Sequence, residues 1–269
     1  EQNWTKLNKI EQNKDYKINL FYVIFFIVLS TFSQKNDSFD KILTKNLKND
    51  SFSIGEQLRY KISYGKQNKK KGILTAGHAT FEIKKHDNNN YLFHGFGKTT
   101  RMFSLFMKVQ HEYKSIANIE TLNLIQSEMT IEEGKFFIHD SIKFDSHTAL
   151  ENSIHDILTT FYKIRTIAMQ DYQNIDTLFF SYYYNGEIIP SYIVKLKKEL
   201  VQTKFGTIKT TKWSPLLEKG RMFKESTGAF IWVTDDAMHI PVKIEFPILV
   251  GSIYVNIIGA KGTMHNLNE

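Results

Sequence analysis

The chain has 269 residues, a formal net charge of +7 and no cysteine. The lack of cysteine excludes disulfides, thiol catalysis, cysteine-ligated zinc and a lipid anchor attached to a cysteine. The positive charge would suit an anionic partner such as phospholipid or lipopolysaccharide. However, the basic residues alternate with acidic ones, so solvated turns are favoured over a binding patch, and we expect no nucleic-acid binding.

The first element in chain order is an apolar run of 13 residues, Leu20–Phe32. Two lysines precede it, and Thr31 and Ser33 supply small residues before a cleavage site. A membrane span needs about 20 apolar residues, whereas a secretory signal has this shorter layout. We therefore expect residues 1–33 to be an N-terminal extension and signal peptide, with a retained anchor as the alternative. The exported protein would be periplasmic or outer-membrane-associated and not a lipoprotein.

Strand-like alternation dominates the chain from Ile54 onward. In Leu58–Tyr64 every even position is apolar and every odd one polar, which is typical of a strand with one face on a core and one in water. We expect a flexible segment over 34–50 and a single β domain over 51–262. The further strand-like runs are 73–84, 91–98, 106–116, 122–131, 135–144, 177–184, 188–196, 200–205, 207–213, 221–225, 229–234, 238–246 and 249–258.

One segment has helical spacing instead. Its apolar residues recur every three or four positions, and Ser153 with Asp156 suggests a capping box. The spacing predicts one amphipathic helix over 153–170, with about six strands before it and eight after. Its packing face would be Ile157, Leu158, Phe161 and Ile164. The predicted fold is mainly β, a strongly curved antiparallel sheet or an open half-barrel with this helix laid on it.

No motif in the sequence carries a recognisable chemistry. The nine histidines lack metal-ligand spacing, and no nucleophile elbow, phosphate loop or dinucleotide fingerprint occurs. We therefore assign no catalytic residue, metal ligand or cofactor. Acids from distant strands, such as Glu56, Glu128 and Asp235, leave a hydrolase acting on glycan or lipid as an alternative.

Aromatic residues are abundant, with 21 Phe, 13 Tyr and 3 Trp. They could line a pocket for an acyl chain or belong to an ordinary core. Strand alternation around Trp232 leads us to expect this ring inside the curved sheet, lining any cavity, although a position against the helix is equally consistent. On the helix, Arg165 should meet a carboxylate of the sheet, as an anchor or as a ligand contact. The candidate lining residues are Phe96, Phe103, Phe106, Tyr162, Arg165 and Trp232.

Several motifs occur in a characteristic order over Ser51–Ile258. They are FSIGEQLRYKISYG at Phe52–Gly65, Ala76–Ala79, Glu133–Gly134, DILTTFYKIR at Asp156–Arg165, IWVTDDAMHIPV at Ile231–Val242 and Gly251–Ile253. In order and spacing the chain resembles the DUF3108 family of exported bacterial proteins of uncharacterised function. The resemblance implies a periplasmic or envelope β protein and carries over no catalytic residues. A half-barrel like that of lipoprotein carriers is an analogy for the fold and does not fix function.

The leading hypothesis is a non-enzymatic envelope protein whose curved sheet binds an apolar ligand, such as a lipid, or a segment of a partner protein. The alternatives are the envelope hydrolase and a structural assembly factor. A large apolar cavity would favour the first hypothesis, and two neighbouring carboxylates in a polar cleft would favour the second.

Overall fold

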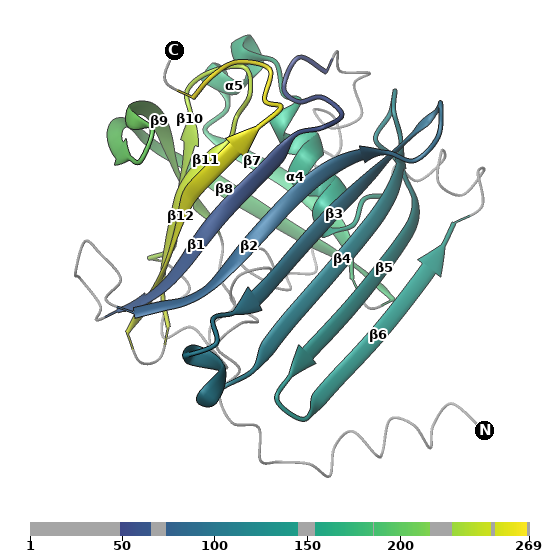
Figure 1. The fold of residues 1–269 in the computed structure, drawn as a ribbon. Coiled ribbons are helices and arrows are strands. Elements are labelled where there is room, and N and C mark those ends of the chain that lie inside the picture. Colours follow the sequence, from purple (N-terminus) through teal and green to yellow (C-terminus); the bar gives the residue numbers. More distant parts are fainter. Residues whose placement is uncertain are drawn as a thin grey trace.

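The computed structural model describes residues 49–65, 74–144, 154–184, 186–215, 228–248 and 251–267. Within these ranges the chain forms one twelve-stranded antiparallel sheet with two α-helices and a short 3-10 helix (Figure 1). The elements are β1 (Gln57–Gly65), β2 (Leu74–Lys85), β3 (Asn90–Thr99), η1 (Phe103–Leu105), β4 (Val109–Asn118), β5 (Leu124–Glu133), β6 (Phe136–Lys143), α4 (Ile157–Arg165), α5 (Met169–Asn174), β7 (Thr177–Tyr184), β8 (Glu187–Thr203), β9 (Gly206–Pro215), β10 (Phe230–Thr234), β11 (Pro241–Pro247) and β12 (Ser252–Lys261).

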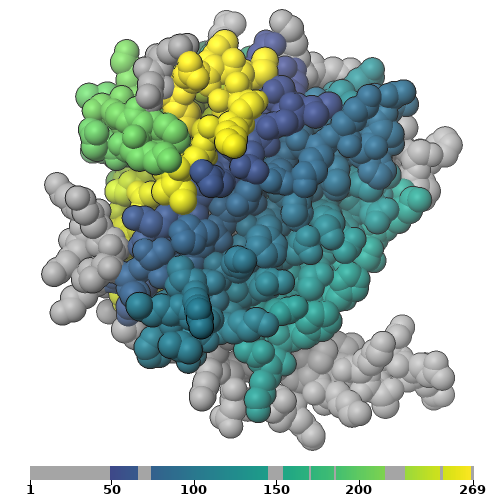
Figure 2. All heavy atoms as spheres, in the orientation of Figure 1, coloured from purple at the N-terminus to yellow at the C-terminus, as the bar shows by residue number. Residues whose placement is uncertain are grey.

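The sheet consists of two meanders joined through the first and last strands. Its order is β6-β5-β4-β3-β2-β1-β12-β11-β10-β9-β8-β7, so β1 pairs with both β2 and β12. The sheet bends around α4, which lies behind β1–β6 when their outer face is viewed as in Figures 1 and 2. Among the described strands, β6 and β7 form the two edges of the sheet. The prediction of a mainly β, curved and open antiparallel sheet is confirmed.

A short extended segment before α4 links the two halves of the sheet near these edges. The carbonyl of Ile154 accepts from the Leu124 amide at 2.9 Å, and the carbonyl of His155 accepts from the Tyr183 amide at 2.7 Å. Asp156 also forms an isolated parallel bridge with Tyr183. The segment thus connects the start of β5 to the end of β7 before the chain enters the helix.

The predicted helix over 153–170 is divided in two, and α4 covers only Ile157–Arg165. Asp156 caps it: its Oδ1 accepts from the Thr159 amide at 2.9 Å, while its own amide donates to the Thr159 hydroxyl at 2.7 Å. Ser153, which we expected in the capping box, lies outside the described residues. The helix ends because the Arg165 carbonyl accepts from Ser51 Oγ and His239 Nδ1 rather than from the next helical turn.

An aromatic cluster fixes α4 against the first half of the sheet. The Tyr162 ring is fully buried and stacks on Phe93 of β3 with ring centroids 4.3 Å apart. Phe52 packs edge-on against Tyr162 at 5.1 Å. Such aromatic pairs contribute about 0.5–1.5 kcal/mol each beyond the area they bury, so this face of the helix is closely packed.

The second half of the sheet contains six described strands, where the sequence suggested about eight. Runs 188–196 and 200–205 form the single long strand β8, which continues through a register shift between Lys195 and Lys197. The run 221–225 lies outside the described residues, as do residues 1–48 with the predicted signal peptide and most of the predicted flexible segment. Among the helices that the structure describes, none is long and apolar enough to cross a membrane.

A buried histidine joins α4 to the turn between β4 and β5. His155 Nδ1 donates to the Leu122 carbonyl at 3.1 Å. Burial, together with the positive charge of Lys163, lowers the pKa of His155 from 6.5 to about 4. The imidazole is therefore neutral in the folded protein at pH 7.

This histidine should make stability pH-dependent. Between about pH 6.5 and pH 4 the unfolded state binds a proton that the folded state does not, so the free energy of unfolding should fall by about 3 kcal/mol as the pH is lowered. His155→Gln keeps a donor for Leu122 and should remove this part of the dependence in urea titrations, whereas exposed His265→Gln should not. If the free energy of unfolding depended on pH equally in wild type and His155→Gln, a lowered pKa of His155 in the folded protein would be contradicted.

Candidate apolar ligand site

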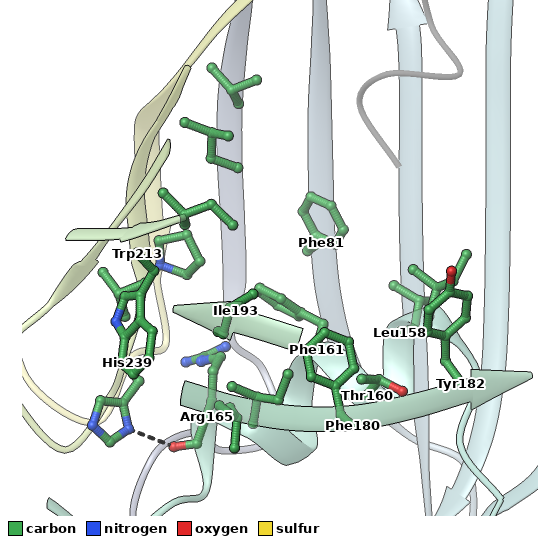
Figure 3. A pocket seen from close by; sticks show the side chains of 18 of the residues that line it. Phe81, Leu158, Thr160, Phe161, Arg165, Phe180, Tyr182, Ile193, Trp213 and His239 are labelled. Atoms are coloured by element: carbon green, nitrogen blue, oxygen red, sulfur yellow. Dashed lines mark hydrogen bonds between the residues drawn. The ribbon is translucent and has the colours of Figure 1, made fainter. Parts of the chain in front are cut away.

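A cavity of about 190 Å³ lies between α4 and the sheet (Figure 3). Its walls are almost wholly apolar. Strands from both halves of the sheet contribute, because the sheet curves until β2 and β7 line the same space. The wall includes Tyr60, Ala79, Phe81, Leu178, Phe180, Tyr182, Ile193, Trp213, Ile231, Val233, Ile244 and Val255 from the sheet, and Ile157, Leu158, Phe161 and Ile164 from α4.

The helix face on this cavity is incompletely covered. Ile157, Phe161 and Ile164 line the cavity and are half-buried, whereas Leu158 is fully buried. These are the four positions predicted from helical spacing as the packing face. Within the described structure, three of the four therefore keep part of their apolar surface uncovered on the side of the cavity.

The charged side chain in the cavity wall is Arg165, and its donors are occupied. Nη1 and Nη2 donate to the two carboxylate oxygens of Glu56 at 2.6 and 2.8 Å. Nη2 also donates to the Ser51 carbonyl at 3.2 Å, and Nε to the Met238 carbonyl at 2.9 Å. Burial alone would disfavour the charged form, but the Glu56 carboxylate outweighs it and raises the pKa of Arg165. Arg165 therefore meets a carboxylate as expected, but the carboxylate belongs to the residue before β1 and not to a strand of the sheet.

His239 adds a neutral group beside this ion pair. Its Nδ1 donates to the Arg165 carbonyl at 2.9 Å, as the dashed line in Figure 3 shows. Burial lowers the pKa of His239, and its ring lies 4.1 Å from that of Tyr172. A neutral histidine with Nδ1 protonated leaves Nε2 as an acceptor, and this buried atom has no hydrogen-bond partner among the described residues.

Of the six predicted lining residues, the structure places only Arg165 in the cavity wall. Tyr162 lies on the packed side of α4. Phe103 is the buried residue of η1, Phe96 is half-buried with Lys98 5.8 Å from its ring, and Phe106 is exposed to solvent. The cluster around residue 103 therefore forms neither a pocket wall nor a lid over the cavity.

Trp232 occupies the opposite face of β10 from the one we expected. Ile231 and Val233 line the cavity, and successive strand residues point to opposite faces. The Trp232 ring is instead covered by the ammonium groups of Lys212 and Lys243, which lie 4.8 and 4.1 Å from its centroid. Its indole N–H donates to Glu199. The long lysine stems and this hydrogen bond thus help to bury the ring on the face of β10 that points away from the cavity.

Sequence reasoning missed the aromatic residues that do line the cavity, above all Phe81, Phe180 and Trp213. The alternation of Leu178, Phe180 and Tyr182 on β7 was a usable signal, because these residues are buried while Phe179 between them is exposed. This alternation alone did not identify which strands would line the same cavity as the helix.

The acids considered for a hydrolase have separate partners on different strands. Glu56 pairs with the cavity arginine. Glu128 on β5 lies 3.6 Å from Lys114, and Asp235 after β10 lies 2.8 Å from Lys198. Strands β5 and β10 stand on opposite sides of β1 in the sheet. In the described part of the chain, no three His, Asp or Glu side chains are placed to hold a metal ion.

The protein is thus an open antiparallel β-barrel that holds a helix in its concavity. An apolar cavity lies between the helix and the sheet. The model of the family described as "Protein of unknown function (DUF3108)" matches residues 59–258. The chain therefore belongs to the DUF3108 family, as its motifs predicted. No curated protein matches the chain in sequence.

Three solved structures share a distant likeness. A β-barrel-like DUF1849 protein from Brucella abortus has 8% identity and a TM-score of 0.39, covering 78% of this chain and 98% of its own. A hypothetical protein from Chlamydia trachomatis has 8% identity and a TM-score of 0.38, covering 78% and 88%. A candidate exported protein with a YmcC-like fold from Bacteroides fragilis has 10% identity and a TM-score of 0.33, covering 80% and 99%.

Removing the arginine should expose the cost of a buried, unpaired carboxylate. Arg165→Met leaves Glu56 charged in the interior, and breaking a buried pair in this way costs about 3–5 kcal/mol. The double variant Arg165→Met, Glu56→Leu should be more stable than Arg165→Met alone. Urea titrations measure both, with exposed Arg101→Met as the control. A loss below about 1 kcal/mol for Arg165→Met would contradict this role.

The cavity also predicts unequal costs for two phenylalanines. Phe93→Ala removes a fully buried ring and should cost about 3–5 kcal/mol. Phe161→Ala should cost less, because part of this ring already faces the cavity and has no packing partners to lose there. Equal losses in urea titrations would mean that the cavity is closed by tight packing in solution.

Proposed function

We propose that the protein is an exported, non-enzymatic binding or carrier protein whose cavity takes the end of one acyl chain or a small apolar molecule. The observation that carries this proposal is an apolar cavity beside a helix face whose large side chains are half-buried. Protein interiors are normally close-packed, and an empty apolar cavity lowers stability. A ligand that fills the space would restore the missing contacts.

The size of the cavity limits what it can enclose. An engineered cavity of about 150 Å³ binds benzene, while pockets for drug-sized ligands measure about 300–1,000 Å³. At about 190 Å³, this site suits one ring or the terminal part of one acyl chain. The rest of a longer lipid would remain outside.

The polar groups of the wall argue against an anionic head group inside. Arg165 donates from Nε, Nη1 and Nη2 to protein acceptors, and its charge is balanced by Glu56. A carboxylate or phosphate entering the cavity would be desolvated without a free cation to receive it. The portion of the ligand that enters is therefore uncharged.

Export rests on the sequence. The 13-residue apolar run Leu20–Phe32 with its basic flank is typical of a secretory signal. The lack of cysteine means that the exported chain must rely on its packed core and not on disulfides. A periplasmic or outer-membrane-associated location would place the cavity among lipid-derived ligands.

Filling the cavity tests the proposal directly. Straight-chain alcohols of increasing length are titrated into the full chain, and displacement of a fluorescent apolar dye is followed. Ile244→Phe adds volume at a half-buried position in the cavity wall and should weaken alcohol binding at least tenfold. Ile188→Phe, at an exposed position on β8, is the matched control and should bind like wild type.

The thermal midpoint is measured for the same variants to confirm that they fold. A folded Ile244→Phe protein that binds as well as wild type would refute the cavity as the binding site. If no alcohol displaces the dye from wild type, the carrier function is refuted and the assembly-factor alternative gains support.

A further inference from the structure

The two most exposed large apolar side chains of the described residues, Leu105 and Phe106, lie together at one end of the sheet. Leu105 and Phe106 are 83% and 82% exposed, and Met102 is 65% exposed. All three belong to the connection between β3 and β4, which we name the tip segment, Arg101–Lys108. In Figure 1 it projects beyond the end of β3, and in Figure 2 it lies at the lower left of the surface.

The tip segment is held in a defined conformation. Its residue Phe103 has a buried side chain, and the Phe103 amide donates to the Thr100 hydroxyl at 3.2 Å. The Phe106 and Met107 amides both donate to the Phe103 carbonyl, at 3.0 and 3.1 Å. One aromatic ring thus anchors the segment while the neighbouring apolar side chains point into solvent. Soluble proteins rarely expose such a cluster without a binding role.

Basic side chains surround these apolar residues. Arg101 and Lys108 stand at the two ends of the tip segment and are exposed. Lys135 is exposed on the adjacent β5–β6 turn, whose Gly134 amide donates to the Lys108 carbonyl at 2.8 Å. Two acids lie at this turn: Glu132, 3.6 Å from Lys108, and the buried Glu133, which contacts His111. The surroundings of the apolar residues therefore carry a net positive charge.

We propose that the tip segment docks this protein on an anionic phospholipid bilayer. Protruding apolar side chains can enter the boundary between head groups and acyl chains, and basic residues beside them are attracted to anionic lipid. A protein groove could also receive Leu105 and Phe106, but it would not by itself account for the positive charge on both sides. The inference rests on the surface of the molecule and does not depend on the cavity.

The cysteine-free chain permits a site-specific test in the full-length protein. Leu105→Cys and Leu200→Cys each introduce one thiol for an environment-sensitive fluorophore, and Leu200, 67% exposed on β8, is the matched control. Vesicles of phosphatidylcholine alone, or with 30% phosphatidylglycerol, are then added. A label at position 105 reports contact of the tip itself, even if another part of the chain also binds the vesicle.

We expect the label at position 105 to brighten at least threefold with anionic vesicles and much less with neutral ones, and the label at position 200 to stay unchanged. Adding Arg101→Gln and Lys108→Gln, or 0.5 M salt, should weaken the response at least fivefold because it depends on charge. No response at position 105, or an equal response at both positions, would overturn the proposal. Ile244→Phe, which fills the cavity, should leave the vesicle response intact.

Discussion

The buried pair between Arg165 and Glu56 is the interaction on which the arrangement of this protein depends. It joins the last residue of α4 to the residue before β1, and further hydrogen bonds of Arg165 reach Ser51 and the loop at Met238 and His239. Three segments far apart in the chain thus meet at one guanidinium. A buried ion pair is often no more stabilising than apolar residues of the same volume. Its value here is that it specifies one position for the helix end.

The start of α4 is fixed by a second buried acid. Asp156 caps the helix through Oδ1, while its Oδ2 accepts from Ser115 at 2.5 Å and from Ser127 at 2.6 Å, on β4 and β5. Both ends of the helix are thus held, and Tyr162 packs against β3. The half-buried residues of α4 that line the cavity are the ones that we propose as a ligand-binding face.

Residue type alone was a poor guide to the residues that line the cavity. Trp232 and Ile231 are neighbours on one strand, and alternation requires them to face opposite ways. Ile231 faces the cavity, while Trp232 is buried on the outer side by Lys212, Lys243 and Glu199. Size and hydrophobicity favoured the tryptophan for the interior. The lysine stems that cover it come from β9 and β11, and their positions follow only from strand order.

The sequence by itself determined the β class, the family, most strands, and a helix with its apolar face, because these depend on local periodicity and on motifs within short segments. It also indicated that Arg165 would need a carboxylate. Only the tertiary structure decided that the partner of Arg165 is Glu56 and where the helix ends. It also decided which face of each strand lies on the concave side of the sheet, and that Leu105 and Phe106 are exposed. These features depend on contacts between segments up to about 200 residues apart, such as the pairing of β1 with β12, and short-range patterns do not encode them.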